Sequence, residues 1–141
     1  MKKMLILILL VVFLLTACDP YVSKRPYDYK NTTWIAKECN MYFYAGEKYK
    51  ISHSALQVNG KSYNLDFTFD YGYGVTIYDA DKLPNEHQHP RDAILLHGRG
   101  SFSEKKFELI FNERSTDNIG LNLKKITFIR TNGEIIPDWA K

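Results

Sequence analysis

Apolar and polar residues alternate along much of the chain with the two-residue period of a β-strand. Four apolar residues of one run are each separated by a single polar residue: Tyr63, Leu65, Phe67 and Phe69. Because successive side chains of a strand point to opposite faces, this run predicts one buried and one wet surface. Asn59-Gly60 separates it from a second run over 49–58. This dipeptide between two strand-like runs predicts a β-hairpin.

Shorter strand-like runs fill most of the remaining chain, over 32–38, 41–44, 93–97, 106–111 and 124–131. We expect Gly98-Arg99-Gly100 to end the run over 93–97. The polar stretch 79–92, which contains Pro84 and Pro90, is expected to be a loop.

One run also fits a helix. Ser101 and Glu104 have the spacing of a capping box, but the alternation of Phe107, Leu109 and Phe111 favours a strand over 106–111. With about eight short strands and frequent turn residues, the pattern predicts an all-β fold, an antiparallel β-barrel or sandwich. A barrel of this size has an interior that is filled or holds one small ligand.

The first residues have a different pattern. Lys2 and Lys3 precede a run over 4–17 that is apolar except for Thr16. This run is shorter than the roughly 20 apolar residues of a membrane-spanning helix and has the length of a signal-peptide core. We therefore expect a signal peptide over 1–17.

The end of that run, Leu15-Thr16-Ala17-Cys18, resembles the lipobox of bacterial lipoproteins. The resemblance implies cleavage before Cys18 and the attachment of two or three acyl chains, such as palmitate, to that cysteine. Two acyl chains suffice for stable membrane anchoring. The alternative is an ordinary secreted protein cut near Ala17. We expect a flexible tether over 18–31, a single β-domain over 32–141, and attachment to the extracytoplasmic face of the plasma membrane.

Composition and charge narrow the function classes. The chain has 19 basic and 16 acidic residues, and two of the basic ones lie in the expected signal peptide. This near-neutral balance does not predict nucleic-acid binding, which needs a clustered basic face. An aromatic content of 14% argues against disorder. Acylation of Cys18 would leave Cys39 alone, either as a small buried residue or as a thiol near His53 or His97.

Two residues resemble features of the lipocalin and calycin group: Trp34 at the start of the first strand and Arg130 at the end of the last. The resemblance implies that the arginine lies across the tryptophan at the closed end of a barrel. Thr32 replaces the glycine of that group. The segments 69–72 and 126–130 are also similar to small uncharacterised lipoproteins of Gram-positive gut bacteria, which implies no known activity.

Candidate binding residues concentrate around the loop over 79–92. Tyrosines suit partner-binding faces, and long loops in compact domains tend to carry function. The candidates are Tyr71, Tyr73, Tyr78, His87 and His89. His87 and His89 would point the same way in an extended segment and could share a cation with Asp79, Asp81 or His97, although solvated histidines are the favoured interpretation. We predict no metal, no cofactor and no catalytic residue.

The sequence therefore predicts a lipid-anchored protein of the cell envelope that binds a ligand, a glycan or another protein without catalysis. The alternative is a proteinaceous inhibitor of a hydrolase such as a lysozyme or a protease. The two differ structurally: a ligand-binding barrel predicts an internal cavity behind Trp34 and Arg130. An inhibitor predicts a filled core and a protruding loop, most plausibly over 79–92.

Overall fold

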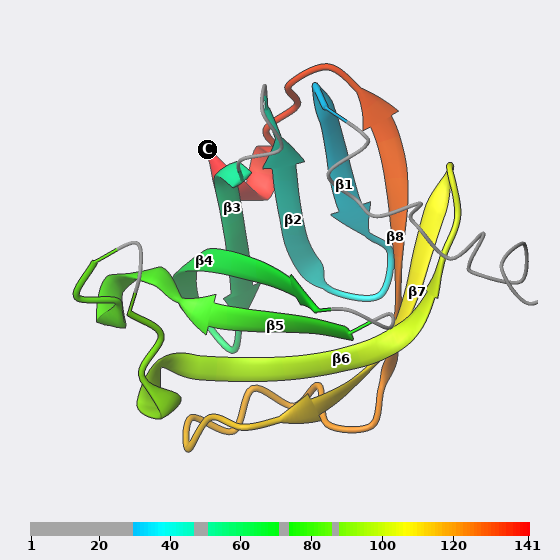
Figure 1. Cartoon of the computed structure of the whole chain (residues 1–141). Coiled ribbons are helices and arrows are strands. Elements are labelled where there is room, and N and C mark those ends of the chain that lie inside the picture. The colour runs from blue at the N-terminus through cyan, green and yellow to red at the C-terminus, as the bar shows by residue number, and fades with distance from the viewer. Residues whose placement is uncertain (1–29, 47–50, 71–73, 86–87) are drawn as a thin grey trace, which may run out of the picture.

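The computed structural model describes residues 30–46, 51–70, 74–85 and 88–141. In these ranges, eight antiparallel strands close into a barrel, each pairing with its neighbours in sequence and the first with the last (Figure 1). The strands are β1 (Thr32–Ala36), β2 (Asn40–Ala45), β3 (Ile51–Val58), β4 (Lys61–Asp70), β5 (Gly74–Asp79), β6 (Ile94–Phe102), β7 (Lys106–Glu113) and β8 (Lys125–Asn132). The all-β prediction is confirmed, and the architecture is a barrel rather than a sandwich.

The hairpin predicted at Asn59-Gly60 is confirmed. Both residues have positive φ, 52° and 74°, and Val58 pairs with Lys61 across the turn. Asparagine and glycine are the residues that adopt this left-handed conformation most readily. The turn fixes the register of β3 against β4, and that register places the apolar residues of β4 inside the barrel.

Strand β6 is longer than the sequence predicts. The prediction that Gly98 and Gly100 end it is wrong, because the strand runs through both glycines to Phe102. A Cβ on Gly98 would lie 2.7 Å from the Phe111 ring, and one on Gly100 would lie 1.8 Å from the Glu108 carbonyl oxygen. These glycines therefore allow β7 to pack closely against β6.

The run over 106–111 is a strand, as predicted, and not the alternative helix. Strand β7 extends to Glu113 and places Phe107, Leu109 and Phe111 in the core. A tight turn connects it to β6, in which the amide of Ser103 donates to the carbonyl of Lys106 at 2.9 Å.

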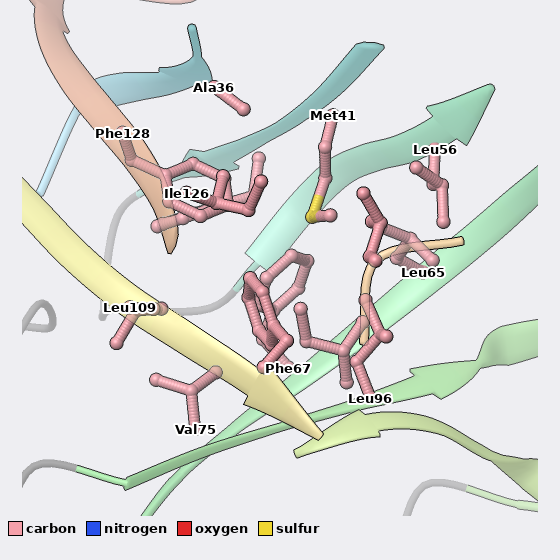
Figure 2. Packing of buried hydrophobic residues seen from close by; sticks show 14 of the residues in the cluster. Ala36, Met41, Leu56, Leu65, Phe67, Val75, Leu96, Leu109, Ile126 and Phe128 are labelled. Carbon is pink, nitrogen blue, oxygen red and sulfur yellow. The ribbon is translucent and has the colours of Figure 1, made fainter. Parts of the chain in front are cut away.

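Stacked aromatic rings and aliphatic side chains together form the core inside the barrel. Trp34 is fully buried and stacks on Phe107, with ring centroids 3.8 Å apart, while Phe43 lies 6.2 Å from Trp34. Figure 2 shows Met41 and Phe67 among the side chains gathered in this core. The region behind Trp34 is thus occupied by side chains.

Strands β1 and β8 close the barrel. Trp34 lies directly opposite Arg130 in their register, and Arg130 Nη1 donates to the carbonyl of Glu104 at 3.2 Å. The Thr33 hydroxyl donates to the carbonyl of Gly133 at 2.7 Å and accepts from the amide of Ile135 at 2.9 Å. The two ends of the domain are therefore joined by side chains as well as by the strand ladder.

Helical structure in the described ranges consists of three short 3₁₀ turns, η3 (Ala80–Lys82), η4 (Arg91–Ala93) and η5 (Asp138–Ala140). None of the described helices has the length and hydropathy needed to cross a membrane. The turns η3 and η4 lie in the segment between β5 and β6, which projects from one side of the barrel (Figure 1).

Candidate functional site

A depression of about 470 Å³ lies on the outer wall of the barrel beside the projecting segment between β5 and β6. Its volume falls within the roughly 300–1,000 Å³ of typical small-molecule sites. The described residues that line it are Thr76, Tyr78, Arg91, Ile94, His97 and Arg114. No carboxylate stands among them.

The register of β5 against β6 builds the floor of this depression. Thr76 lies opposite His97, and the Thr76 hydroxyl is 3.0 Å from His97 Nδ1. Tyr78 lies opposite Ile94, after a register shift between Ile77 and Tyr78. Thr76 and Tyr78 are each 8% exposed although they face away from the barrel core. The floor is therefore a packed surface with a polar end and an apolar end.

Two arginines supply the positive charge at the rim. Arg91 belongs to η4, and Arg114 directly follows β7, where its amide donates to the carbonyl of Leu95 at 2.8 Å. Within the described residues neither guanidinium forms an ion pair, and both residues are exposed. Two arginines from separate parts of the chain thus line one depression.

The structure brings together two of the residues predicted for a binding face. The rings of Tyr78 and His89 lie 4.8 Å apart between centroids, and His89 Nε2 is 3.7 Å from Asp66 Oδ2 on β4. Tyr78 lines the depression, and His89 packs against it from the projecting segment. The other three predicted residues, Tyr71, Tyr73 and His87, lie outside the described residues.

The residues weighed for a cation site have other contacts. Asp79 accepts from the amide of Asp81 at 3.2 Å and lies 3.6 Å from Lys82 Nζ. Asp81 accepts from the Asn64 amide group at 3.1 Å, while His97 faces Thr76. In the part of the chain that the structure describes, no three histidine, cysteine or acidic residues are grouped as a metal site would require.

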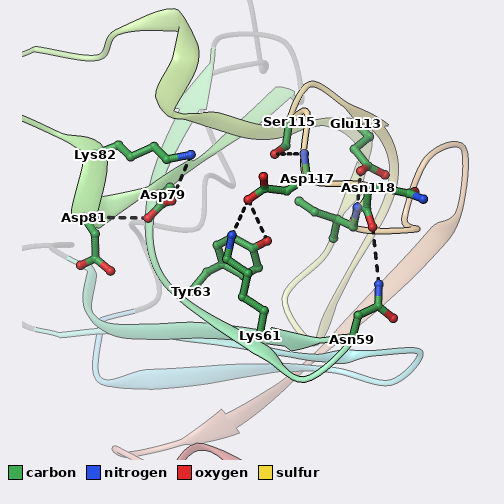
Figure 3. Close-up of polar contacts among 11 residues, drawn as sticks. Asn59, Lys61, Tyr63, Asp79, Asp81, Lys82, Glu113, Ser115, Asp117 and Asn118 are labelled. Atoms are coloured by element: carbon green, nitrogen blue, oxygen red, sulfur yellow. Dashed lines mark hydrogen bonds and ion pairs between the residues drawn. The ribbon is translucent and has the colours of Figure 1, made fainter.

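A second depression, of about 270 Å³, lies near the β3–β4 turn and differs in its electrostatics. Its charges pair with each other: Lys61 Nζ lies 2.5 Å from Asp117 Oδ2, to which the Tyr63 hydroxyl also donates at 3.1 Å (Figure 3). The hydrogen bonds from Lys61 and then from Tyr63 lower the pKa of Asp117. These contacts join the segment after β7 to β4. We therefore interpret this cluster as part of the structure of the barrel and not as a binding site.

Cys39 has the environment of a structural thiol. It packs against the hydrophobic core, and burial, assisted by the charge of Glu38, raises its pKa to about 12. A nucleophilic cysteine needs the opposite shift. Cys18, the predicted acylation site, lies outside the described residues.

Sequence reasoning missed most residues of the outer depression. Arg91 and Arg114 are separated along the chain and line the same depression because the end of β7 returns to Leu95 on β6. The available signal was strand parity, which places Thr76 and His97 on the outer faces of adjacent strands. Comparisons with protein-family models, curated proteins and solved structures found no match to this chain.

Proposed function

We propose that this chain is a lipid-anchored protein of the cell envelope that binds a ligand in the depression on its outer wall, without catalysis. The observation that carries the proposal is the depression itself, in which arginine, histidine, threonine and tyrosine side chains line one concave surface. Concave sites with a few convergent polar groups are the usual form of small-molecule sites. A binding site on the outer wall also fits an interior occupied by stacked rings.

The anchor half of the proposal rests on the first 18 residues, which have a short basic start, an apolar run and a lipobox-like end. Metabolic labelling with an alkyne-tagged palmitate tests it. We expect Cys18→Ser to lose the label and leave the membrane fraction. Cys39→Ser is the matched control and should keep both. Equal labelling of the two variants would contradict the anchor.

The binding half can be tested by filling the depression. Ile94 is half-buried in its floor, whereas Ile110 on β7 is 52% exposed outside it. Full-length protein is purified from its own envelope without chelator and examined by native mass spectrometry. We expect a reproducible non-covalent mass, beyond that of the lipid-modified chain, on the wild type and on Ile110→Trp, and we expect Ile94→Trp to lose it. An identical mass on all three, or bare protein throughout, would count against the site.

A second candidate, the hydrolase inhibitor, is favoured by a different observation. The described interior is packed with side chains, and the segment between β5 and β6 projects from the barrel (Figure 1). An inhibitor would insert this segment into an enzyme. Assays against lysozymes and secreted proteases, with the wild type and a deletion of 81–90, test this role. Inhibition that is lost on deletion would favour it over the ligand-binding role.

A further inference from the structure

We infer that the depression on the outer wall recognises an oxyanion, a phosphate or carboxylate group, held between Arg91 and Arg114. This inference rests on the proposed function and adds the chemical class of the ligand. It starts from the charge of the lining: two arginines line a depression whose described lining contains no acidic residue.

Arginine suits this task because its planar group offers several N–H donors in the geometry that matches carboxylate and phosphate oxygens. Within the described ranges, Arg91 and Arg114 have no ion pair with which a ligand would have to compete. Other basic residues of the barrel do: Lys61 pairs with Asp117, and Lys125 pairs with Glu108 at 2.9 Å. The two arginines are therefore available to a ligand, and their place in the lining of the depression distinguishes them from unpaired basic residues elsewhere on the described barrel, such as Arg99.

The acids next to the depression in sequence or in register, Glu113, Asp66 and Asp92, lie outside its described lining. The carboxylate of Glu113, beside Arg114 in sequence, accepts from the amides of Ile119 and, at 3.1 Å, Gly120. Asp66, opposite Tyr78 on β4, faces His89. Asp92, beside Arg91 in η4, is exposed. Because the two arginines are the charged residues of the described lining apart from His97, the lining favours an anionic ligand.

The floor complements an anion with a larger body. Thr76 and His97 share one hydrogen bond, and when the hydroxyl donates to Nδ1 the neutral ring carries its proton on Nε2 as a further donor. Tyr78 and Ile94 provide an aromatic and an aliphatic surface at the other end. We therefore expect the oxyanion to be part of a molecule with an apolar or ring-shaped portion.

The test uses the four histidines of the chain as probes. Full-length protein in a nonionic detergent is titrated with inorganic phosphate and, separately, with acetate, at fixed pH and an ionic strength of about 0.15 M. The histidine ring protons are followed by NMR and assigned with His→Gln variants. His53 serves as an internal control, since it pairs with Glu134 at 3.0 Å and is not part of the depression.

We expect saturable shifts of the His97 ring signals with His53 unmoved. Arg91→Gln/Arg114→Gln should weaken binding at least about tenfold, because hydrogen bonds to charged groups are the strong ones. Arg99→Gln is the matched control, since Arg99 is exposed on β6, the strand of His97, and is not a lining residue, and it should bind like the wild type. A response to phosphate alone assigns a phosphate ligand, and a response to acetate alone assigns a carboxylate.

No shift with either anion would overturn the inference, as would equal shifts in the double-arginine variant. The native mass spectra test the proposed function separately from this inference. If that mass is present and lost in Ile94→Trp while neither anion moves His97, the depression binds an uncharged ligand and only the oxyanion inference falls. If the mass is absent as well, both fall.

Discussion

Replacing Trp34 by alanine should remove a large part of the stability of the barrel. The side chain is fully buried, stacks on Phe107 at 3.8 Å, and donates from Nε1 to the Thr32 hydroxyl at 3.0 Å. An aromatic side chain buries about 150–250 Å², which at about 25 cal/mol per Å² corresponds to about 4–6 kcal/mol. Large-to-small replacements of this kind cost about 3–5 kcal/mol.

This loss is a large part of the total free energy of unfolding of the domain. A domain of this size has a free energy of unfolding of about 5–15 kcal/mol, so a cost of about 3–5 kcal/mol removes between about a fifth and all of it. Urea unfolding followed by far-ultraviolet circular dichroism measures the change. If Trp34→Ala does not fold, Trp34→Phe keeps a ring against Phe107 and should lose only about 1–2 kcal/mol.

Trp139 provides the matched control within the same chain. It lies in η5, is partly exposed, and contacts Tyr42 edge-to-face with ring centroids 5.6 Å apart. Trp139→Ala should cost about 0.5–1.5 kcal/mol, the value of one aromatic pair. If the two alanine variants differ by less than about 1 kcal/mol, the view that stacked rings around Trp34 hold the barrel together is wrong.

Three further measurements address other parts of the barrel. Gly100→Ala would place a Cβ 1.8 Å from the Glu108 carbonyl oxygen, so it should destabilise by about 3 kcal/mol or more in urea unfolding, whereas Gly60→Ala, with open space but positive φ, should cost about 1–2 kcal/mol. The raised pKa of Cys39, about 12, keeps its side chain in the thiol form at pH 8. In a folded Cys18→Ser protein, iodoacetamide should therefore alkylate Cys39 about a thousandfold more slowly than after unfolding in urea. Comparable rates would show that the thiol is not protected. The pKa of Asp117 is lowered, so its ion pair with Lys61 stabilises the fold above the ordinary aspartate pKa of about 3.9 and loses that effect as the pH falls through the lowered value. Asp117→Asn should therefore flatten the fall of the urea midpoint with decreasing pH. Asp92→Asn, at an exposed carboxylate, should leave the slope of that fall unchanged.

Local patterns predicted most of the strands. The alternation after Asn59-Gly60 and the apolar residues of β7 each specify a buried face without reference to the rest of the chain. The error at Gly98 and Gly100 has a non-local cause, because these residues are glycines to make room for Phe111 and for the backbone of β7. A sequence read strand by strand treats such glycines as breaks.

The candidate site depended still more on distant contacts. Tyr78 and His89 were predicted because both flank the long polar stretch, and the structure brings their rings together. The two arginines carried no local signal. Their place in one lining depends on the register of β5 with β6 and on the carbonyl of Leu95, which accepts from the amide of Arg114. Non-local pairings of this kind cannot be derived from periodicity.

The pairing of β1 with β8 gives the barrel a seam. Seven of its ladders join strands that are neighbours in sequence, but this one joins Thr32 to Asn132 and must wait for both ends of the domain. Closing such a long loop is slow because its entropy is lost before the contacts form. A chain shortened before β8 would therefore leave β1 and β7 as two open edges at once, and open edges recruit strands from other molecules. The last strand thus protects the first from aggregation as well as completing the sheet.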